Sequence, residues 1–382
     1  MASSTVLVLG GGIGGLVAAR RLRERLDRQH RVVLVERQAE HVFSPSLLWL
    51  SVGLRKPEQF SRPVSALERA GVELVRGSVE RIDPSAKTIR VDGRELRGDY
   101  LVVALGAELA PEKIPGLAEA GHNLYTVSGS EALRDARLEL RSGQVVVLVS
   151  SVPFKCPAAP YEAAMLLEYD FRKRKLRDRV TFELHTPEPG PMPVAGPEVS
   201  SRIRQMIEAK GIVYRPQHPV ERVEAKQILF KDGASVRFDL LAYVPPHRAP
   251  QVVRDAGLVD DSGWVPVDKG TLQTRFPGIY AIGDVTGIML ASGRPLPKAG
   301  VFAHAEAEVV AGNLVHEISG KGRPRRFDGH GACFVETGDG KAGFGSGNFY
   351  AEPAPRVKLW RPSRALHMGK VAFEKYWLFK QF

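Results

Sequence analysis

The 382-residue sequence predicts an α/β protein with two Rossmann-like dinucleotide-binding domains in tandem and a small C-terminal unit. A glycine-rich turn at residues 10–15 follows a short apolar strand and opens a helical pattern. Strands and helices alternate again between residues 144 and 247, as in a doubly wound α/β domain. Because 43% of the residues are hydrophobic, a chain of this length can build more than one core.

The first turn, Gly10-Gly11-Gly12-Ile13-Gly14-Gly15, has the spacing G-x-G-x-x-G between a strand and a helix. Its glycines permit a tight turn and a close approach of the backbone to a pyrophosphate, which the helix N-terminus then faces. Glu36 ends the next strand, 21 residues after Gly15, where an acid can accept hydrogen bonds from ribose hydroxyls. The pattern therefore predicts a bound dinucleotide.

Two later segments indicate whether the bound dinucleotide is FAD or NAD. Residues 99–107 form a strand that ends in small residues, and residues 276–284 form a strand that ends in Gly-Asp. With the first turn, this trio resembles the two-dinucleotide-binding-domain flavoproteins, so the expected cofactor is non-covalent FAD. The predicted cofactor-binding residues are Gly10, Gly12, Ile13, Gly14, Gly15, Glu36, Arg37, Ser44, Pro45, Val79, Ala104, Leu105, Gly106, Gly283, Asp284, Lys298, Ala299 and Gly300.

Lys298 lies just before a predicted helix over residues 303–318. A cation or a helix N-terminus at this place is expected to stabilise an anionic reduced flavin. The apolar, aromatic segment 41–49 either walls the flavin or packs in the core.

The second domain begins with an apolar strand at residues 144–149, but no glycine follows it. The turn carries Cys156 instead, and the chain has one further cysteine, Cys333. In a cytoplasmic protein a disulfide is more often catalytic than structural. We therefore expect the two thiols to form a redox pair over the flavin, with two unrelated buried thiols as the alternative.

The chain has a formal net charge of +11, and its last 27 residues carry seven basic residues and one acid. No run of ~20 apolar residues occurs, and the N-terminus lacks the pattern of a signal peptide, so the cytoplasmic side is expected. Aromatic residues interleaved with lysines at 364–380 predict a peripheral contact with the membrane surface, and a core helix or a dimer contact remains open. Neither a nucleic-acid partner nor a metal site is predicted, and a homo-oligomer is left open.

At several places the chain resembles the sulfide:quinone oxidoreductase family, which is close to flavocytochrome c sulfide dehydrogenases and type-2 NADH dehydrogenases. The resemblance covers essentially the whole chain. It rests on residues 10–15, Phe43-Ser44-Pro45, Lys155-Cys156 with Ala159-Pro160, residues 297–300, Cys333-Phe334 and residues 370–376.

The resemblance implies that hydrosulfide attacks an oxidised Cys156–Cys333 pair by thiol–disulfide exchange, and that Cys333 then passes two electrons to FAD. Lys155 is expected to favour the Cys156 thiolate, and Glu162 to accept a proton. Electrons then reach a membrane quinone. The expected quinone-channel residues are Phe334, Phe373, Tyr376 and Trp377.

Three departures from the family pattern bear on these expectations. Residues 111–143 hold no third cysteine, which the family commonly has, and this puts polysulfide growth and full sulfide turnover in doubt. No histidine follows residues 186–189, and no cysteine near Val42 can tether the flavin. The alternatives are a type-2 NADH:quinone dehydrogenase, which would need a second glycine-rich turn near Ser150, and a flavin-bound redox sensor that does not turn over.

The expected domain boundaries follow from these motifs. Residues 1–110 and 269–320 form the two parts of the FAD-binding domain, and residues 111–268 form the second Rossmann-like domain with a degenerate NAD site. Residues 321–382 form the unit that contacts quinone and membrane.

Overall fold

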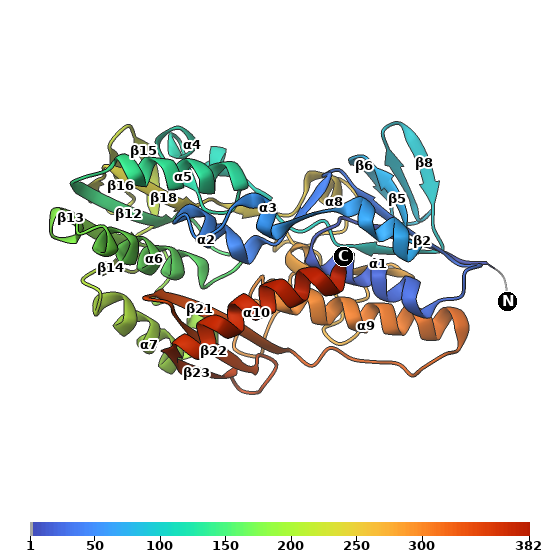
Figure 1. Ribbon diagram of the computed structural model, residues 1–382. Helices are drawn as coiled ribbons and strands as arrows, with labels where there is room; N and C mark the ends of the chain where they lie inside the picture. The colour runs from blue at the N-terminus through green and yellow to red at the C-terminus, as the bar shows by residue number, and fades with distance from the viewer. Residues whose placement is uncertain (1–2) are drawn as a thin grey trace.

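The protein, described here by a computed structural model that covers residues 3–382, is built around two parallel five-stranded sheets (Figure 1). The first sheet has the strand order β20-β9-β1-β2-β5. Its strands are β1 (Thr5–Leu9), β2 (Arg31–Glu36), β5 (Glu73–Arg76), β9 (Tyr100–Val103) and β20 (Ile279–Ala281).

The first sheet is held by apolar strands that are buried on both faces. In β1, residues 6–9 are buried, and β1 pairs in parallel with both β2 and β9. Helices α1 (Ile13–Arg25) and α9 (Gly300–Ser319) pack against each other, so segments almost 300 residues apart in the chain share one layer. A near-continuous apolar pattern of this kind is typical of parallel strands covered by helices.

The second sheet repeats the design in the order β11-β18-β12-β13-β14. Helix α6 packs against β12 and β13, and α7 against β14. The prediction of a mixed α/β fold with two such sheets is confirmed. The bounds are β11 (His122–Asn123), β12 (Gly143–Val149), β13 (Val180–His185), β14 (Val213–Arg215), β18 (Leu240–Val244), α5 (Val127–Glu139), α6 (Ala159–Lys173) and α7 (Pro197–Glu208).

Each parallel sheet is accompanied by a three-stranded antiparallel sheet that the sequence analysis did not resolve. These are β6 (Val79–Asp83), β7 (Thr88–Val91) and β8 (Arg94–Arg97) in the first half, and β15 (Val220–Glu224), β16 (Gln227–Phe230) and β17 (Ser235–Arg237) in the second. The remaining short elements are β3 (Glu40–Val42), α2 (Leu47–Ser51), α3 (Pro57–Phe60), β4 (Ser61–Pro63), β10 (Glu108–Leu109), α4 (Leu117–Ala120), β19 (His247–Arg248) and α8 (Gln251–Asp255).

The C-terminal unit is an antiparallel sheet followed by one long helix, α10 (Arg364–Gln381), drawn in red across the front of Figure 1. The sheet consists of β21 (His330–Gly338), β22 (Lys341–Asn348) and β23 (Arg356–Ser363). Strand β21 packs against α6, so this unit covers the helix that follows the cysteine turn.

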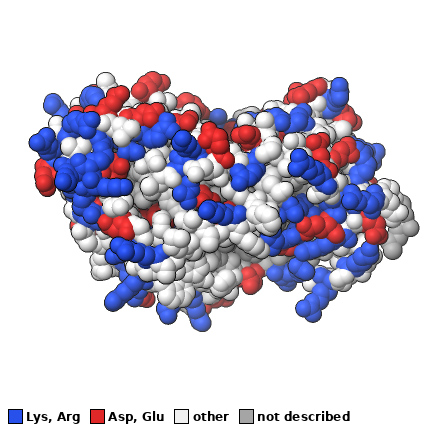
Figure 2. Space-filling view, in the orientation of Figure 1, with Lys and Arg blue, Asp and Glu red and all other residues white. Residues whose placement is uncertain are grey.

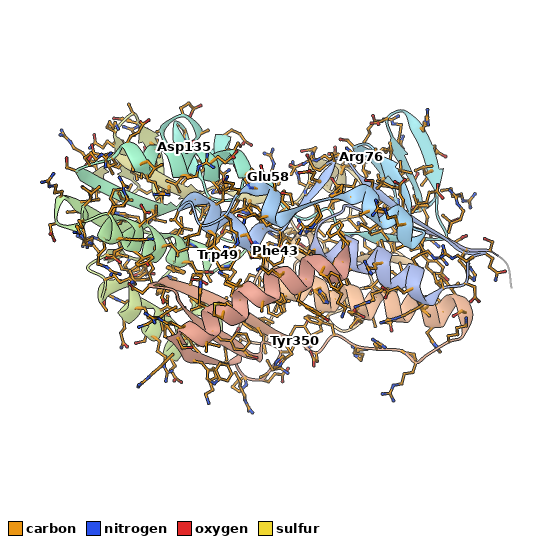
Figure 3. The ribbon with its side chains drawn as sticks, viewed as in Figure 1. Phe43, Trp49, Glu58, Arg76, Asp135 and Tyr350 are labelled. Carbon is orange, nitrogen blue, oxygen red and sulfur yellow. The ribbon has the colours of Figure 1, made fainter. Side chains whose placement is uncertain are left out.

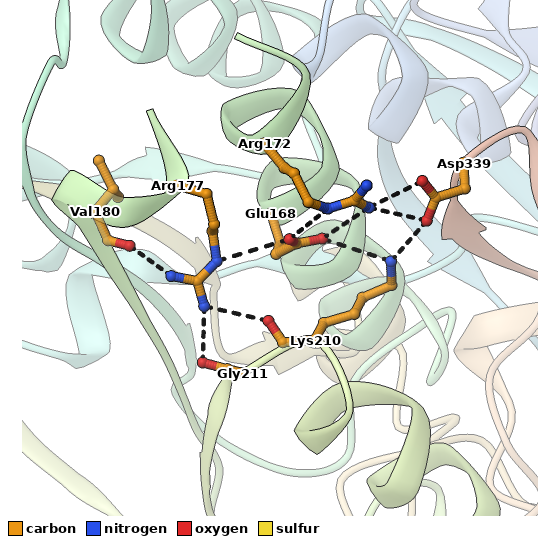
Figure 4. Close-up of polar contacts among 7 residues, drawn as sticks. All are labelled: Glu168, Arg172, Arg177, Val180, Lys210, Gly211 and Asp339. Carbon is orange, nitrogen blue, oxygen red and sulfur yellow. Dashed lines mark hydrogen bonds and ion pairs between the residues drawn. The ribbon is translucent and has the colours of Figure 1, made fainter. Parts of the chain in front are cut away.

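An ion-pair network fastens the turn between β21 and β22 to the second domain (Figure 4). Arg172 bonds both Glu168 and Asp339, and Lys210 contacts the same two carboxylates at 3.5 and 3.1 Å. Glu168 is buried, so three cations (Arg172, Arg177 and Lys210) compensate the cost of its burial. Among the described residues, no helix is long and apolar enough to cross a membrane.

Candidate active site

A cavity of about 1990 Å³ runs between the first sheet, the second domain and the C-terminal unit. It collects residues from distant parts of the chain. Gly15 and Tyr376 do not line it. The predicted site residues that do are Gly10, Gly12, Ile13, Gly14, Glu36, Arg37, Ser44, Pro45, Val79, Ala104, Leu105, Gly106, Lys155, Cys156, Glu162, Gly283, Asp284, Lys298, Ala299, Gly300, Cys333, Phe334, Phe373 and Trp377.

One end of the cavity is the glycine turn between β1 and α1. A Cβ on Gly12 would have no heavy atom within 4 Å, whereas a Cβ on Gly15 would lie 1.8 Å from the Gly10 carbonyl oxygen. Gly12 therefore leaves room for a ligand, and Gly15 lets the helix pack against the turn. No side chain caps α1, and its first turn carries no acid, so its N–H groups remain free for an anion.

Glu36 lines the cavity at the end of β2. Its Oε2 accepts the Gly11 N–H at 2.5 Å, and its Oε1 accepts the Gln38 N–H at 2.6 Å. Each oxygen keeps a second lone pair, so the carboxylate can still accept from a ribose hydroxyl.

The Gly283–Asp284 turn is held by a hydrogen bond to a residue that was not among the predicted site residues. Glu306 on α9 is buried and accepts the Gly283 N–H at 2.6 Å. Burial raises the pKa of Glu306 to about 7, against the opposing effect of that hydrogen bond. Glu306 falls on the buried apolar face of α9, between Phe302 and Val310, and this position was the signal in the sequence.

Lys298 is buried, and its Nζ donates to the carbonyl oxygens of Asp284 at 2.8 Å and Thr286 at 2.9 Å. The same Nζ lies 3.3 Å from the centre of the Trp264 ring. Burial lowers the pKa of Lys298 to about 8, although Asp284 and Glu306 favour the charged form. The lysine thus stiffens the Gly-Asp turn, while its stabilisation of a reduced flavin stays a prediction.

The cysteine turn after β12 is pinned to the Lys298 loop. The Cys156 N–H donates to the Lys298 carbonyl oxygen at 2.7 Å, and the Tyr125 hydroxyl donates to the Lys155 carbonyl oxygen at 2.6 Å. Cys156 has a φ of +51°, in the left-handed region that non-glycine residues rarely adopt. These backbone bonds hold the strained residue in place.

Cys156 reaches the cavity from the second domain, and Cys333 reaches it from β21. Both are free thiols. Cys333 is open to the cavity and Cys156 is half-buried. Desolvation by the surrounding protein raises the pKa of both thiols, to about 12 for Cys333, and the Glu162 carboxylate adds to each shift. Cys333 also raises the pKa of Cys156, because two thiolates so near each other repel.

Lys370 is a cation that favours the thiolate form of both cysteines, and the role expected for Lys155 stays a prediction. Lys370 on α10 is buried, opposes the rise in the pKa of both thiols, and bonds Glu162 at 2.8 Å. The Lys155 Nζ lies 5.6 Å from the centre of the Tyr125 ring. Glu162 is buried too, and it also accepts the Glu336 N–H at 2.9 Å.

The far end of the cavity is aromatic. Trp377 stacks on His41 with ring centres 5.1 Å apart and lies 5.2 Å from Phe43, which also contacts Phe373. Phe43 and Trp49 lie beside α10 in Figure 3. Trp49 is buried, and the cationic groups of Arg55 and Lys370 lie 4.4 and 4.9 Å from its ring centre.

This chain is similar in sequence and structure to known proteins. The pyridine nucleotide-disulphide oxidoreductase family model matches residues 4–307, which is most of the chain. The chain belongs to this family. The prediction of a flavin enzyme with FAD as cofactor is confirmed by the family, and the open glycine turn at α1 fits the pyrophosphate of such a cofactor.

Within the pyridine nucleotide-disulphide oxidoreductases, the chain is similar to proteins named for sulfide and quinone. It is 28% identical to a sulfide-quinone reductase of Aquifex aeolicus, over 98% of this chain and 90% of that protein. It is 27% identical to a mitochondrial sulfide:quinone oxidoreductase of Mus musculus, over 91% of this chain and 79% of that protein. The solved structure of the Aquifex aeolicus sulfide:quinone oxidoreductase superposes with a TM-score of 0.90 at 27% identity, covering 99% of this chain and 91% of that one. The resemblance stated from the sequence is thereby confirmed.

Proposed function

We propose that this chain is a peripheral flavoenzyme on the cytoplasmic face of the membrane, which oxidises sulfide at Cys156 and Cys333 and delivers the electrons to quinone. One observation carries the proposal. The only two thiols in 382 residues, 177 positions apart, line the same cavity as the FAD-binding turns. The printed names of the similar proteins support the choice of substrate and acceptor.

The chemistry starts from the oxidised pair. Hydrosulfide attacks the sulfur of Cys156, a new S–S bond forms there, the Cys156–Cys333 bond breaks, and Cys333 leaves as a thiolate. Lys370 stabilises that anion electrostatically, because it favours the thiolate form of Cys333. FAD, non-covalently bound in this cavity, supplies the two-electron acceptor. The sulfur atom taken up remains on Cys156 as a persulfide.

The quinone side is formed by α10. Its inner face holds Lys370, Glu374 and Trp377 inside the protein, and Arg55 and Ser46 bond the buried Glu374. Its outer face exposes large apolar side chains, and the middle of this face of the molecule is largely uncharged, with lysines and arginines around it (Figure 2). These exposed side chains are Met368, Phe373, Tyr376 and Phe379, at 62%, 46%, 58% and 84%. Such a surface suits insertion into the interfacial layer of a bilayer.

Anaerobic flavin absorbance during sulfide addition tests the redox pair. The flavin of the native protein is expected to bleach when sulfide is added. In Cys156→Ser the rate of this bleaching is expected to fall by on the order of 10⁴-fold. The variant should still retain FAD and still be reduced by dithionite. Equal rates in the two proteins would show that the pair is not catalytic. Repeated turnover with a soluble quinone excludes a sensor, and rapid bleaching by NADH would favour an NADH dehydrogenase.

Sedimentation with vesicles tests the membrane contact. Phe379→Ser removes the most exposed large apolar side chain of α10 and is expected to weaken binding. Leu138→Ser on α5, which removes a side chain that is 47% exposed, is the matched control and should bind as the native protein does. Equal loss in both variants, or no loss in Phe379→Ser, would contradict the assignment of α10.

A further inference from the structure

Six glutamates are buried in the described part of the chain, and four of them lie within ion-pair distance of a basic side chain. Glu162 pairs with Lys370, Glu168 with Arg172, Glu336 with His367 and Glu374 with Arg55. Glu188 and Glu306 have no cation within ion-pair distance among the described residues. Glu306 holds the Gly283 N–H, whereas Glu188 lines the main cavity and has no role in the chemistry above.

Glu188 is held by one of its two oxygens. Its Oε2 accepts from the Tyr161 hydroxyl and from the Thr186 hydroxyl at 3.2 Å, while Oε1 has no hydrogen-bond partner among the described residues. Tyr161 lies in the first turn of α6, three residues before Ala164 and five after Cys156. The same helix start thus follows the reactive thiol and anchors a carboxylate with one unused oxygen.

The cavity-lining residues that are closest to Glu188 along the chain are apolar. These residues are Pro187, Pro189, Met192, Pro193, Ala195 and Val199. None of them has a side chain that can take up a proton. Burial raises the pKa of Glu188 to about 7, against the hydrogen bonds from Tyr161 and Thr186 and the charge of Arg294.

The other titratable groups coupled to Glu188 come from two elements and two loops. They are Arg294, which is always charged, Tyr125 in the loop before α5, Tyr161 on α6 and Tyr214 on β14. Burial raises the pKa of each phenol, so all three tyrosines stay neutral. Glu188 is therefore the group in this set that can exchange a proton near neutral pH.

We infer that Glu188 is the proton acceptor of the sulfur substrate in this cavity. The inference rests on the proposed function. Hydrogen sulfide gives its proton to the Glu188 carboxylate, an S–H bond breaks, an O–H bond forms, and the hydrosulfide released attacks Cys156. Glu162 is poorly suited to this step, because its protonation would leave the buried Lys370 without its partner.

The test is the pH profile of flavin reduction by sulfide. Glu188→Gln preserves the size of the side chain and one acceptor oxygen. It is expected to lower the rate by about 10²-fold below neutral pH and to approach the native rate at alkaline pH, where hydrosulfide is already present. Tyr161→Phe removes a hydrogen bond that favours the carboxylate, so its profile is expected to shift towards alkaline pH. Native-like profiles in both variants would overturn the inference.

Glu168→Gln is the matched control, because Glu168 is a buried acid of α6 that does not line the cavity. Its pH profile is expected to follow that of the native protein, whatever its stability. A profile altered as in Glu188→Gln would make the effect a general one of removing a buried acid, and would overturn the inference.

Infrared difference spectra on sulfide addition separate this inference from the proposed function. The native protein should gain the C=O band of a protonated carboxyl that Glu188→Gln lacks. If sulfide reduces no flavin but the band appears, the proposed function fails and Glu188 still stands as the sulfide-responsive acid. A spectrum without this band refutes the role of Glu188 whether or not the flavin is reduced.

Discussion

The turns after β1 and β12 occupy equivalent places in two parallel sheets and have opposite chemistry. After β1, an uncapped helix without an acid in its first turn faces open space at Gly12. After β12, the Cys156 N–H is already bonded to Lys298, Pro160 lacks an N–H, and Glu162 places a carboxylate in the first turn of α6. The second turn would repel a pyrophosphate, which shows that one architecture serves phosphate binding or thiol chemistry according to a few residues.

The largest change expected in this comparison is at the second turn. Lys370→Met leaves Glu162 buried without its cation and is expected to cost about 3–5 kcal/mol of the free energy of unfolding. Denaturant unfolding of the FAD-loaded protein measures the cost. The double variant Lys370→Met/Glu162→Gln should recover part of it, and a loss equal to or larger than that of the single variant would contradict the pairing.

At the first turn, stability and FAD binding should depend on the volume of the side chains and not on their charge. Gly15→Ala would place a Cβ 1.8 Å from the Gly10 carbonyl oxygen, so the helix must shift, at about 1–3 kcal/mol. Thermal unfolding and FAD content measure the effect. In Gly12→Ala the methyl group meets no protein atom, so FAD retention should fall with little loss of stability of the apoprotein. Equal losses of stability in both would break the distinction drawn between these glycines.

The smallest effect concerns the lysine whose backbone pins the second turn. The folded-state pKa of Lys298 is lowered to about 8, so between this pH and the ordinary lysine pKa the unfolded chain binds more protons. For this group, stability therefore rises with pH across that window, and its burial cost is fully present below it. Lys298→Met should remove that rise, which melting temperatures of both proteins at pH 8 and 10 would reveal; parallel curves would contradict it.

Local sequence patterns predicted much of the fold and part of the candidate site. The glycine turn, the strand 144–149 and the helix expected at 303–318 lie close to the observed α1 start, β12 and α9. The antiparallel sheets were missed because their short strands alternate without a long apolar run. Lys155 was named as the cation because it is adjacent to Cys156 in sequence, whereas tertiary packing of α10 brings in Lys370 from 214 positions away. Glu188 could not be assigned, because burial without a counter-charge is a property of the folded chain.

The placement of Cys333 on β21 has a consequence for the newly made protein. Domains tend to fold from the N-terminus during synthesis, so the FAD turn and the Cys156 turn can form before β21 and α10 have been made. The second thiol, Cys333, and Lys370 follow Cys156 by 177 and 214 positions. A ribosome-bound chain therefore carries a solitary Cys156 until both of these residues have been made, and its redox centre is completed late in synthesis.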